Sequence, residues 1–215
     1  MKPELTPEDL LLSACTFCAQ QHVYADLYGV TDGKAVGTFV EHKFRDMLEA
    51  SFSVMRGNSA KGLDLPSVET DIKVTSRKQP QSSCPFRSAR QKVFGLGYNL
   101  LLMVYEKSDD HVLKTATLQF VRCAFIAQHR TADYQLTRAI LEALERDANR
   151  DDIMALLIDR NLPGDEIVLG LLADEILQTP PHLGYLTISN ALQWRLQYER
   201  VVKMQEEVEG IVRIA

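Results

Sequence analysis

One continuous apolar segment, residues 98–105, constrains the fold more than any other part of the chain. It reads Tyr-Asn-Leu-Leu-Leu-Met-Val-Tyr, and such a run without polar alternation is expected for a central strand that is buried on both faces. A second strand is predicted at residues 115–127, where Leu118, Phe120 and Phe125 supply apolar side chains. Because helices must cover such a sheet, the pattern predicts an α/β protein.

Helical segments precede and follow these strands in the sequence. Thr6 and Pro7 are typical of a helix start, and apolar residues recur at helical spacing in residues 35–55. Further helices are predicted at residues 88–96, 133–145, 151–161, 164–178 and 190–209. The order predicts one domain of 215 residues, with an α/β core at residues 35–130 and a helical C-terminal part at residues 131–215.

The composition is that of an ordinary globular protein, with 46% hydrophobic and 25% charged residues. No apolar run approaches the roughly 18 residues of a membrane span. The N-terminus lacks the features of a signal peptide, so we expect a cytoplasmic protein with no membrane partner. The motif Gly95-Leu96-Gly97 lacks a third glycine, so no nucleotide cofactor is predicted. The four cysteines, Cys15, Cys18, Cys84 and Cys123, form no framework. The Cys15-x-x-Cys18 pair is expected to consist of buried free thiols, with a metal or redox site as the alternative.

Charged residues alternate along residues 69–73. If this segment is a strand, its period of two places Glu69, Asp71 and Lys73 on one face. Asp64 lies upstream, across a proline-containing break that can turn the chain so that Asp64 faces Asp71. Two carboxylates and an ammonium group at the rim of a sheet can bind Mg²⁺ and activate water. The alternative is an exposed ion pair on an edge strand, which contributes little to stability.

This arrangement resembles the PD-(D/E)XK nuclease superfamily, which includes most type II restriction endonucleases. In that family an Asp on one strand of a hairpin precedes an acid-x-Lys motif on the next strand, and a preceding helix often supplies another acid. The resemblance assigns these roles to Asp64, to Asp71-Ile72-Lys73 and to Glu49. The spacing is most similar to the branch that contains the mismatch-repair nicking endonuclease. The fold implied is a restriction-endonuclease-like mixed sheet flanked by helices.

The chemistry that the resemblance implies is hydrolysis of a phosphodiester bond. Asp64, Asp71 and Glu49 would bind one or two Mg²⁺ ions, for which Mn²⁺ could substitute. Lys73 would orient or help deprotonate the attacking water, or contact the phosphate as a point charge. The sequence departs from the commoner family pattern because the second acid is Asp rather than Glu. Glu69 could also compete as a ligand.

Basic and polar residues surround this segment. Residues 61–92 contain seven basic and three acidic side chains, although the net charge of the chain is -5. This local excess favours a phosphate-bearing substrate, and a solvated loop is the alternative. The candidate DNA contacts are Lys61, Ser76, Arg77, Lys78, Gln79, Gln81, Ser82, Ser83, Asn190, Gln193 and Arg195. The last three lie on the final predicted helix, which could instead pack or dimerise through its apolar positions.

The resulting hypothesis is a Mg²⁺-dependent type II restriction endonuclease that cleaves duplex DNA at a specific sequence and leaves a 5′ phosphate. A homodimer is expected, because palindromic sites require a two-fold symmetric protein. A nicking endonuclease of the DNA-repair kind with the same site is one alternative. A non-catalytic DNA-binding regulator is another, and it would have no need of the two acids and the lysine.

Overall fold

The structure is a computed structural model that describes residues 2–54, 63–83, 88–189 and 194–215. The chain divides into two compact units that alternate along the sequence. The first unit consists of Met1–Ser82, Asn99–Ile126 and Gln205–Ala215. The second unit consists of Ser83–Tyr98 and Ala127–Met204. The chain therefore passes between the units after residues 82, 98, 126 and 204.

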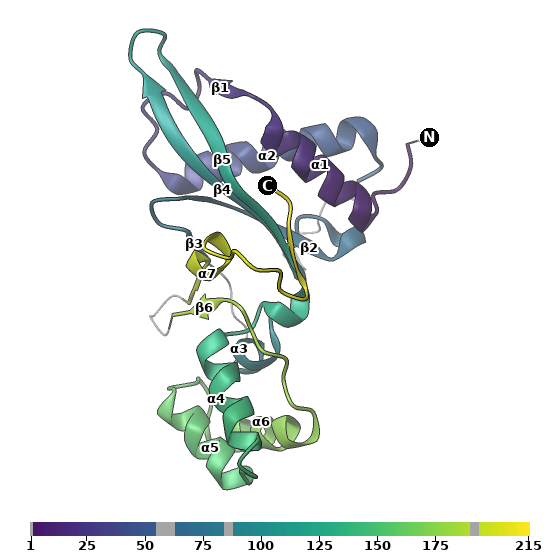
Figure 1. Cartoon of the computed structure of the whole chain (residues 1–215), viewed down its shortest axis with the longest axis vertical. Helices are drawn as coiled ribbons and strands as arrows, with labels where there is room; N and C mark the ends of the chain where they lie inside the picture. The colour runs from purple at the N-terminus through teal and green to yellow at the C-terminus, as the bar shows by residue number, and fades with distance from the viewer. Residues whose placement is uncertain (1, 55–62, 84–87, 190–193) are drawn as a thin grey trace. The chain divides into compact units, whose positions relative to one another are not determined.

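The first unit is built on a mixed sheet. Its longest strands are β4 (Asn99–Asp110) and β5 (Thr115–Ile126), which pair antiparallel as the long hairpin seen in Figure 1. On one side of this hairpin, β2 (Thr70–Ser76) runs parallel to β4 and forms the edge of the sheet. On the other side, β1 (His22–Tyr24) and β8 (Ile211–Arg213) both pair with β5.

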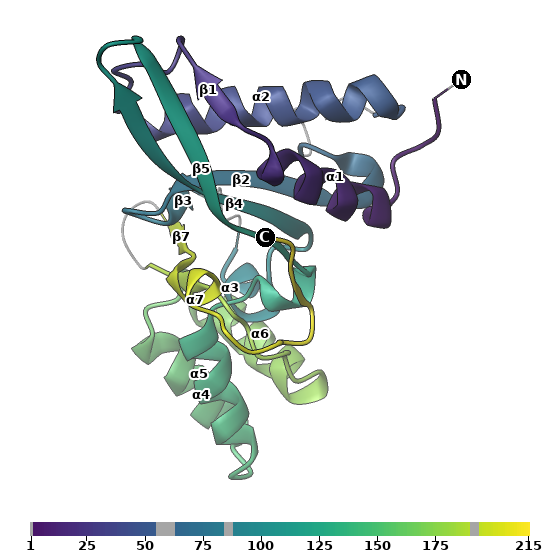
Figure 2. The same cartoon turned by 45° about the horizontal axis from the view of Figure 1, so that its top comes forward.

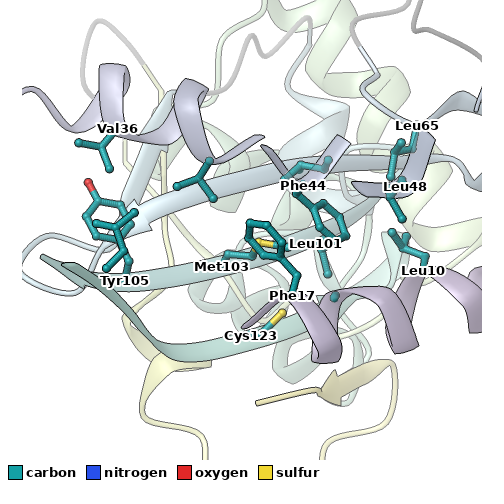
Figure 3. Packing of buried hydrophobic residues seen from close by; sticks show 14 of the residues in the cluster. Leu10, Phe17, Val36, Phe44, Leu48, Leu65, Leu101, Met103, Tyr105 and Cys123 are labelled. Atoms are coloured by element: carbon teal, nitrogen blue, oxygen red, sulfur yellow. The ribbon is translucent and has the colours of Figure 1, made fainter. Parts of the chain in front are cut away.

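Two helices cover one face of this sheet. Helix α1 (Pro7–Ala19) begins with a capping box between Thr6 and Asp9 and packs against β5. Helix α2 (Gly33–Ser51) begins at Asp32 and packs against β2. Figure 3 shows how the apolar side chains of both helices meet those of β4 and β5. The labelled members of this core are Leu10, Phe17, Val36, Phe44, Leu48, Leu65, Leu101, Met103, Tyr105 and Cys123.

Helix α2 approaches β2 closely at Gly37. A Cβ atom at this position would lie 3.2 Å from the backbone oxygen of Val74. The absence of a side chain at Gly37 therefore lets α2 pack tightly against the edge strand. Glu41 and Arg45 follow at intervals of four residues, so they lie on the same side of α2 as Gly37.

The second unit is mainly helical. Helices α4 (Tyr134–Leu144), α5 (Arg150–Asp159) and α6 (Glu166–Gln178) form its core with the short α3 (Arg90–Phe94), as Figure 2 shows. Strands β6 (Thr187–Ile188) and β7 (Arg195–Gln197) pair antiparallel, and α7 (Glu199–Val202) follows them. Strand β3 (Gln81–Ser83) lies where the chain first passes between the units.

Most of the predicted elements are confirmed. The strands predicted at residues 98–105 and 115–127 are β4 and β5, and β4 extends five residues beyond the end of the apolar run. The helices predicted at residues 35–55, 133–145, 151–161 and 164–178 correspond to α2, α4, α5 and α6. The fold is a mixed α/β fold, as predicted. None of the described helices is long and apolar enough to cross a membrane.

The predicted final helix, residues 190–209, is wrong for the part that the structure describes. Arg195–Gln197 is strand β7, Glu199–Val202 is one helical turn, and the chain then continues toward β8. Leu196 and Tyr198 are both fully buried, and their spacing is that of a strand. Apolar residues at helical spacing were present as well, but burial in a sheet outweighed the local preference for a helix.

Candidate active site

A tight loop brings Asp64 beside the start of β2. Leu65 and Thr70 exchange backbone hydrogen bonds of 3.0 and 3.1 Å across the 3-10 turn Pro66–Val68. Glu69 ends this turn in the left-handed conformation, with φ of 47°, and its side chain is exposed. Glu69 therefore lies outside β2, and the prediction that it shares a strand face with Asp71 and Lys73 is wrong.

Asp64 is held by one donor on each of its oxygens. The backbone N–H of Ile72 donates to Oδ2 at 3.0 Å, and Nη2 of Arg45 donates to Oδ1 at 2.8 Å. β2 is an edge strand that pairs with β4 along one side only. The N–H of Ile72 points to the unpaired side and can therefore donate to Asp64. These two donors fix the carboxylate of Asp64 against the start of β2.

Asp71 and Lys73 form a largely buried ion pair on β2. Nζ of Lys73 lies 2.7 Å from Oδ2 of Asp71, and the side chains are 19% and 7% exposed. Both residues lie on the sheet face opposite Ile72, which belongs to the core beneath α1 and α2. An exposed edge-strand pair was the alternative explanation for these charges, and their burial argues against it.

Burial and a second carboxylate together alter the ionisation of Asp71. Its pKa is raised to about 7, first by burial and then by its hydrogen bond to Asp64, while Lys73 acts in the opposite direction. With a pKa of about 7, Asp71 remains protonated in part at neutral pH. Burial lowers the pKa of Lys73, but the charges of Asp71, Asp64 and Glu41 outweigh it and raise the pKa overall.

Helix α2 contributes a third carboxylate, Glu41. Its pKa is raised to about 7, first by burial and then by the negative charge of Asp64, while Lys73 and Arg45 lower it. The sequence predicts Glu49 for this role. Glu49 lies two turns further along α2, about 12 Å along the helix axis, and its backbone oxygen accepts a hydrogen bond from Lys2. Glu41, which interacts electrostatically with Asp64, Asp71 and Lys73, is therefore a further candidate for the helical acid.

The donor set of this acid cluster (Glu41, Asp64, Asp71 and Lys73) suits a hard divalent cation. Three carboxylates face only two cations, Lys73 and Arg45, and two of the carboxyl groups have pKa values raised to about 7. In the described ranges, no group of three or more His, Cys, Asp or Glu is arranged as a complete metal-binding set. Mg²⁺ is commonly bound through one or two carboxylates, with water and phosphate completing its shell. The Asp64–Asp71 pair fits that requirement.

The polar loop after β2 is compact. Oγ1 of Thr75 donates to the backbone oxygens of Gln79 and Gln81 at 3.2 and 3.1 Å and accepts from the N–H of Gln81 at 3.2 Å. The N–H of Arg77 donates to the oxygen of Tyr105 at 2.8 Å, which extends the pairing of β2 with β4. Lys78 and Gln79 are exposed at the tip of this turn.

The remaining candidate DNA contacts fall into three groups. Ser76, Gln81 and Ser82 are half-buried beside this turn, and Ser83 is exposed. Arg195 is exposed on β7 in the second unit. Lys61, Asn190 and Gln193 lie outside the described residues. The structure thus groups the candidates of residues 76–82 with the acid cluster in the first unit and assigns Arg195 to the other unit.

Three residues near the candidate site were not predicted from the sequence. They are Glu41 and Arg45 on α2, and Arg122 on β5. Arg122 on β5 has a pKa lowered by burial and by the charges of Arg213 and Arg77. The sheet register places Arg122 and Thr75 on opposite sides of Val104, on the sheet face that bears Asp71 and Lys73. The signal for Glu41 and Arg45 was their position four and eight residues after Gly37. Arg122 had no signal in its apolar surroundings.

The mixed sheet flanked by helices, with acids at its edge strand, is compatible with a restriction-endonuclease-like fold. The family model for type II restriction enzyme NspV matches residues 4–213. A curated relative, the type II restriction enzyme NspV of Nostoc sp. (strain ATCC 29411 / PCC 7524), is 52% identical over 212 residues, which cover 98% of this chain and 96% of the relative. The chain therefore belongs to the NspV family of type II restriction enzymes. No solved structure matches it.

Proposed function

We propose that this chain is a Mg²⁺-dependent endonuclease that hydrolyses phosphodiester bonds of duplex DNA at a specific sequence and leaves 5′ phosphates. Membership of the NspV family of type II restriction enzymes supports sequence-specific cleavage. The acid cluster supports the hydrolytic chemistry. The observation that carries the proposal is the grouping of two carboxylates and a lysine at the edge strand, where Nζ of Lys73 lies 2.7 Å from Oδ2 of Asp71 and the N–H of Ile72 donates to Asp64 at 3.0 Å. Two carboxylates so close repel each other, and a fold gains no stability from pairing like charges.

In this proposal Asp64 and Asp71 hold the metal, and Glu41 binds it directly or through a water molecule. When bound, the cation neutralises charge on the phosphate and lowers the pKa of a bound water. Arg45 and the N–H of Ile72 keep Asp64 in place with hydrogen bonds of 2.8 and 3.0 Å. This support positions a charged ligand on a rigid sheet edge rather than on a free loop.

Lys73 acts as a charged donor rather than as a base. Its raised pKa keeps the ammonium group protonated at neutral pH. One of its N–H groups is directed to Asp71 at 2.7 Å, and two others remain to orient the attacking water or to contact a phosphate oxygen. Of the roles considered for Lys73, the structure favours orientation and charge stabilisation over proton abstraction.

DNA binding in the first unit is assigned to the compact loop after β2 and to the sheet face that bears Asp71. Lys78 and Gln79 are exposed at the loop tip, and Arg77, Arg122 and Arg213 interact electrostatically. Cations of this kind contact phosphates, which sets the register of the protein on duplex DNA. A homodimer would present two such sites to a palindromic sequence, and a solution mass of two chains would support it.

The proposal is tested with plasmid and phage DNA incubated with and without Mg²⁺. Wild type and Glu69→Gln, a matched change at an exposed acid two residues from Asp71, should both yield discrete Mg²⁺-dependent fragments. Asp71→Asn should yield none, because the neutral amide removes a charged metal ligand while its size preserves the packing.

Each other outcome points elsewhere. Nicked plasmid without linear product would favour the nicking endonuclease. DNA that wild type binds but leaves intact in Mg²⁺ and in Mn²⁺ would favour the non-catalytic regulator. Full cleavage by Asp71→Asn would reject the acid cluster as the active site.

A further inference from the structure

The second unit contains a pocket of about 300 Å³ that shares no residue with the acid cluster. One side of α4 forms most of its lining, through Tyr134, Arg138 and Glu142. Arg160, which follows α5, and Arg200, in α7, complete it. Three arginines from three separate elements therefore converge on one depression within a single unit.

This pocket is positively charged. Its lining contains three guanidinium groups and one carboxylate, that of Glu142. Glu142 is already paired, because Nε of Arg138 lies 2.6 Å from its Oε1. The lining thus carries two more positive than negative charges, and Arg160 also acts on its neighbour Lys92, whose pKa is lowered by burial and then by Arg160. Clustered cations of this kind repel one another and favour an anion between them.

The guanidinium group of Arg200 stacks on tyrosine rings, and its Nε–H lacks a hydrogen-bond acceptor among the described residues. Its Cζ atom lies 3.5 Å from the ring centroid of Tyr134 and 5.7 Å from that of Tyr185. Its Nε is buried and has no hydrogen-bond partner among the residues that the structure describes. A buried N–H without an acceptor is costly. Stacking on a ring holds the guanidinium plane but leaves its edge free for an oxyanion.

We propose that this pocket binds a phosphate group of the DNA backbone, with Arg200 as the central donor and Arg138 and Arg160 beside it. The inference rests on the proposed function, since it assigns to the helical unit a contact with the same duplex. A phosphate offers several oxygens to planar guanidinium donors. Arg138 and Arg160 are exposed, so a phosphate that belongs to a long polymer can reach them.

The test measures binding of the full chain to a fluorescein-labelled duplex by anisotropy, in EDTA and over a series of KCl concentrations. Arg200→Gln and, separately, Arg160→Gln should each weaken binding roughly three- to tenfold. Each should also reduce the slope of log affinity against log salt by about 0.9, the value for one lost phosphate contact. Arg146→Gln removes an exposed arginine of the same unit from outside the pocket lining and should change neither quantity.

Thermal unfolding distinguishes a variant that has lost a DNA contact from one whose fold is destabilised. Arg200→Gln could destabilise the unit by losing its stacking on Tyr134, whereas Arg160 is exposed and its replacement should leave the unfolding temperature unchanged. Unchanged affinity and salt slope in both variants would overturn the proposal. A second result would also overturn it. Inorganic phosphate would raise the unfolding temperature of wild type but not of Arg200→Gln, while the DNA affinity of Arg200→Gln stayed the same as that of wild type. The pocket would then bind a free anion rather than DNA.

The outcome is independent of the active site. If Asp71→Asn abolishes cleavage while Arg200→Gln binds DNA like wild type, the catalytic proposal stands and the pocket proposal fails. If Asp71→Asn cleaves DNA while Arg200→Gln has the reduced salt slope, the pocket proposal stands and the assignment of the active site fails.

Discussion

At the scale of single residues, the acid cluster is a source of instability in the metal-free protein. Asp71 is 5% exposed and adjoins a second carboxylate. Its pKa is raised from 3.8 to about 7 on folding. The folded protein therefore binds more protons than the unfolded chain between these values, so the contribution of Asp71 to stability decreases as pH rises from about 4 to 7.

Asp71→Asn should consequently stabilise the metal-free protein at pH 8. The neutral amide removes the cost of ionising a buried carboxyl group, which amounts to a few kcal/mol in the free energy of unfolding. Urea unfolding in EDTA at pH 5 and pH 8 measures the difference, with Glu69→Gln as the control. If wild type and Asp71→Asn responded identically to pH, the raised pKa of Asp71 would be disproved.

Lys73 provides a second prediction at this scale. Lys73→Gln should reduce the rate of DNA cleavage by about 100-fold or more, because a donor for the developing negative charge is lost. Binding to duplex DNA should remain within a few-fold of wild type, since Lys73 is only 19% exposed and is paired with Asp71. Cleavage rates and anisotropy measure the two effects, and full activity of Lys73→Gln would refute its catalytic role.

At the scale of elements, the close approach of α2 to β2 sets the position of Glu41 and Arg45. Gly37→Val should shift α2 away from β2, because its Cβ atom alone would lie 3.2 Å from the oxygen of Val74. We expect a loss of about 1–3 kcal/mol in the free energy of unfolding and a reduced cleavage rate. Gly33→Ala, at a position in α2 where no atom lies within 4 Å of the added group, is the matched control and should keep full activity. Equal activity in both variants would show that the approach at Gly37 does not matter.

Periodicity predicted the elements of this fold better than it predicted their contacts. The buried run of β4 and the apolar stripe of α2 follow directly from side-chain spacing. The same stripe could not distinguish Glu41 from Glu49, because both residues flank it, about two turns apart along the helix axis. Their positions relative to β2 depend on where α2 crosses that strand, which is a tertiary contact. The strand β7 was missed because its three residues pair with β6 only in the folded unit.

At the scale of the whole molecule, the first unit is assembled from three separate stretches of chain. Its last stretch, Gln205–Ala215, contains β8, which pairs with β5 along Ala124–Ile126. Deletion of residues 205–215 should therefore destabilise the first unit and abolish cleavage, although it removes no member of the acid cluster. Limited proteolysis should cut within residues 2–54 of the truncated chain, and an intact, active first unit would contradict this expectation.

The hydrogen bond from the N–H of Ile72 to Asp64 has a consequence for solubility. β2 is the edge of its sheet, and an edge strand with free N–H groups can pair with another chain and aggregate. Asp64 occupies one of these groups with a charged side chain, and charge on an edge also opposes such pairing. Asp64→Ala would free that N–H and remove the charge. Aggregation would then accompany loss of activity in this variant, whereas Asp64→Asn keeps the acceptor and is the better choice for measuring chemistry alone.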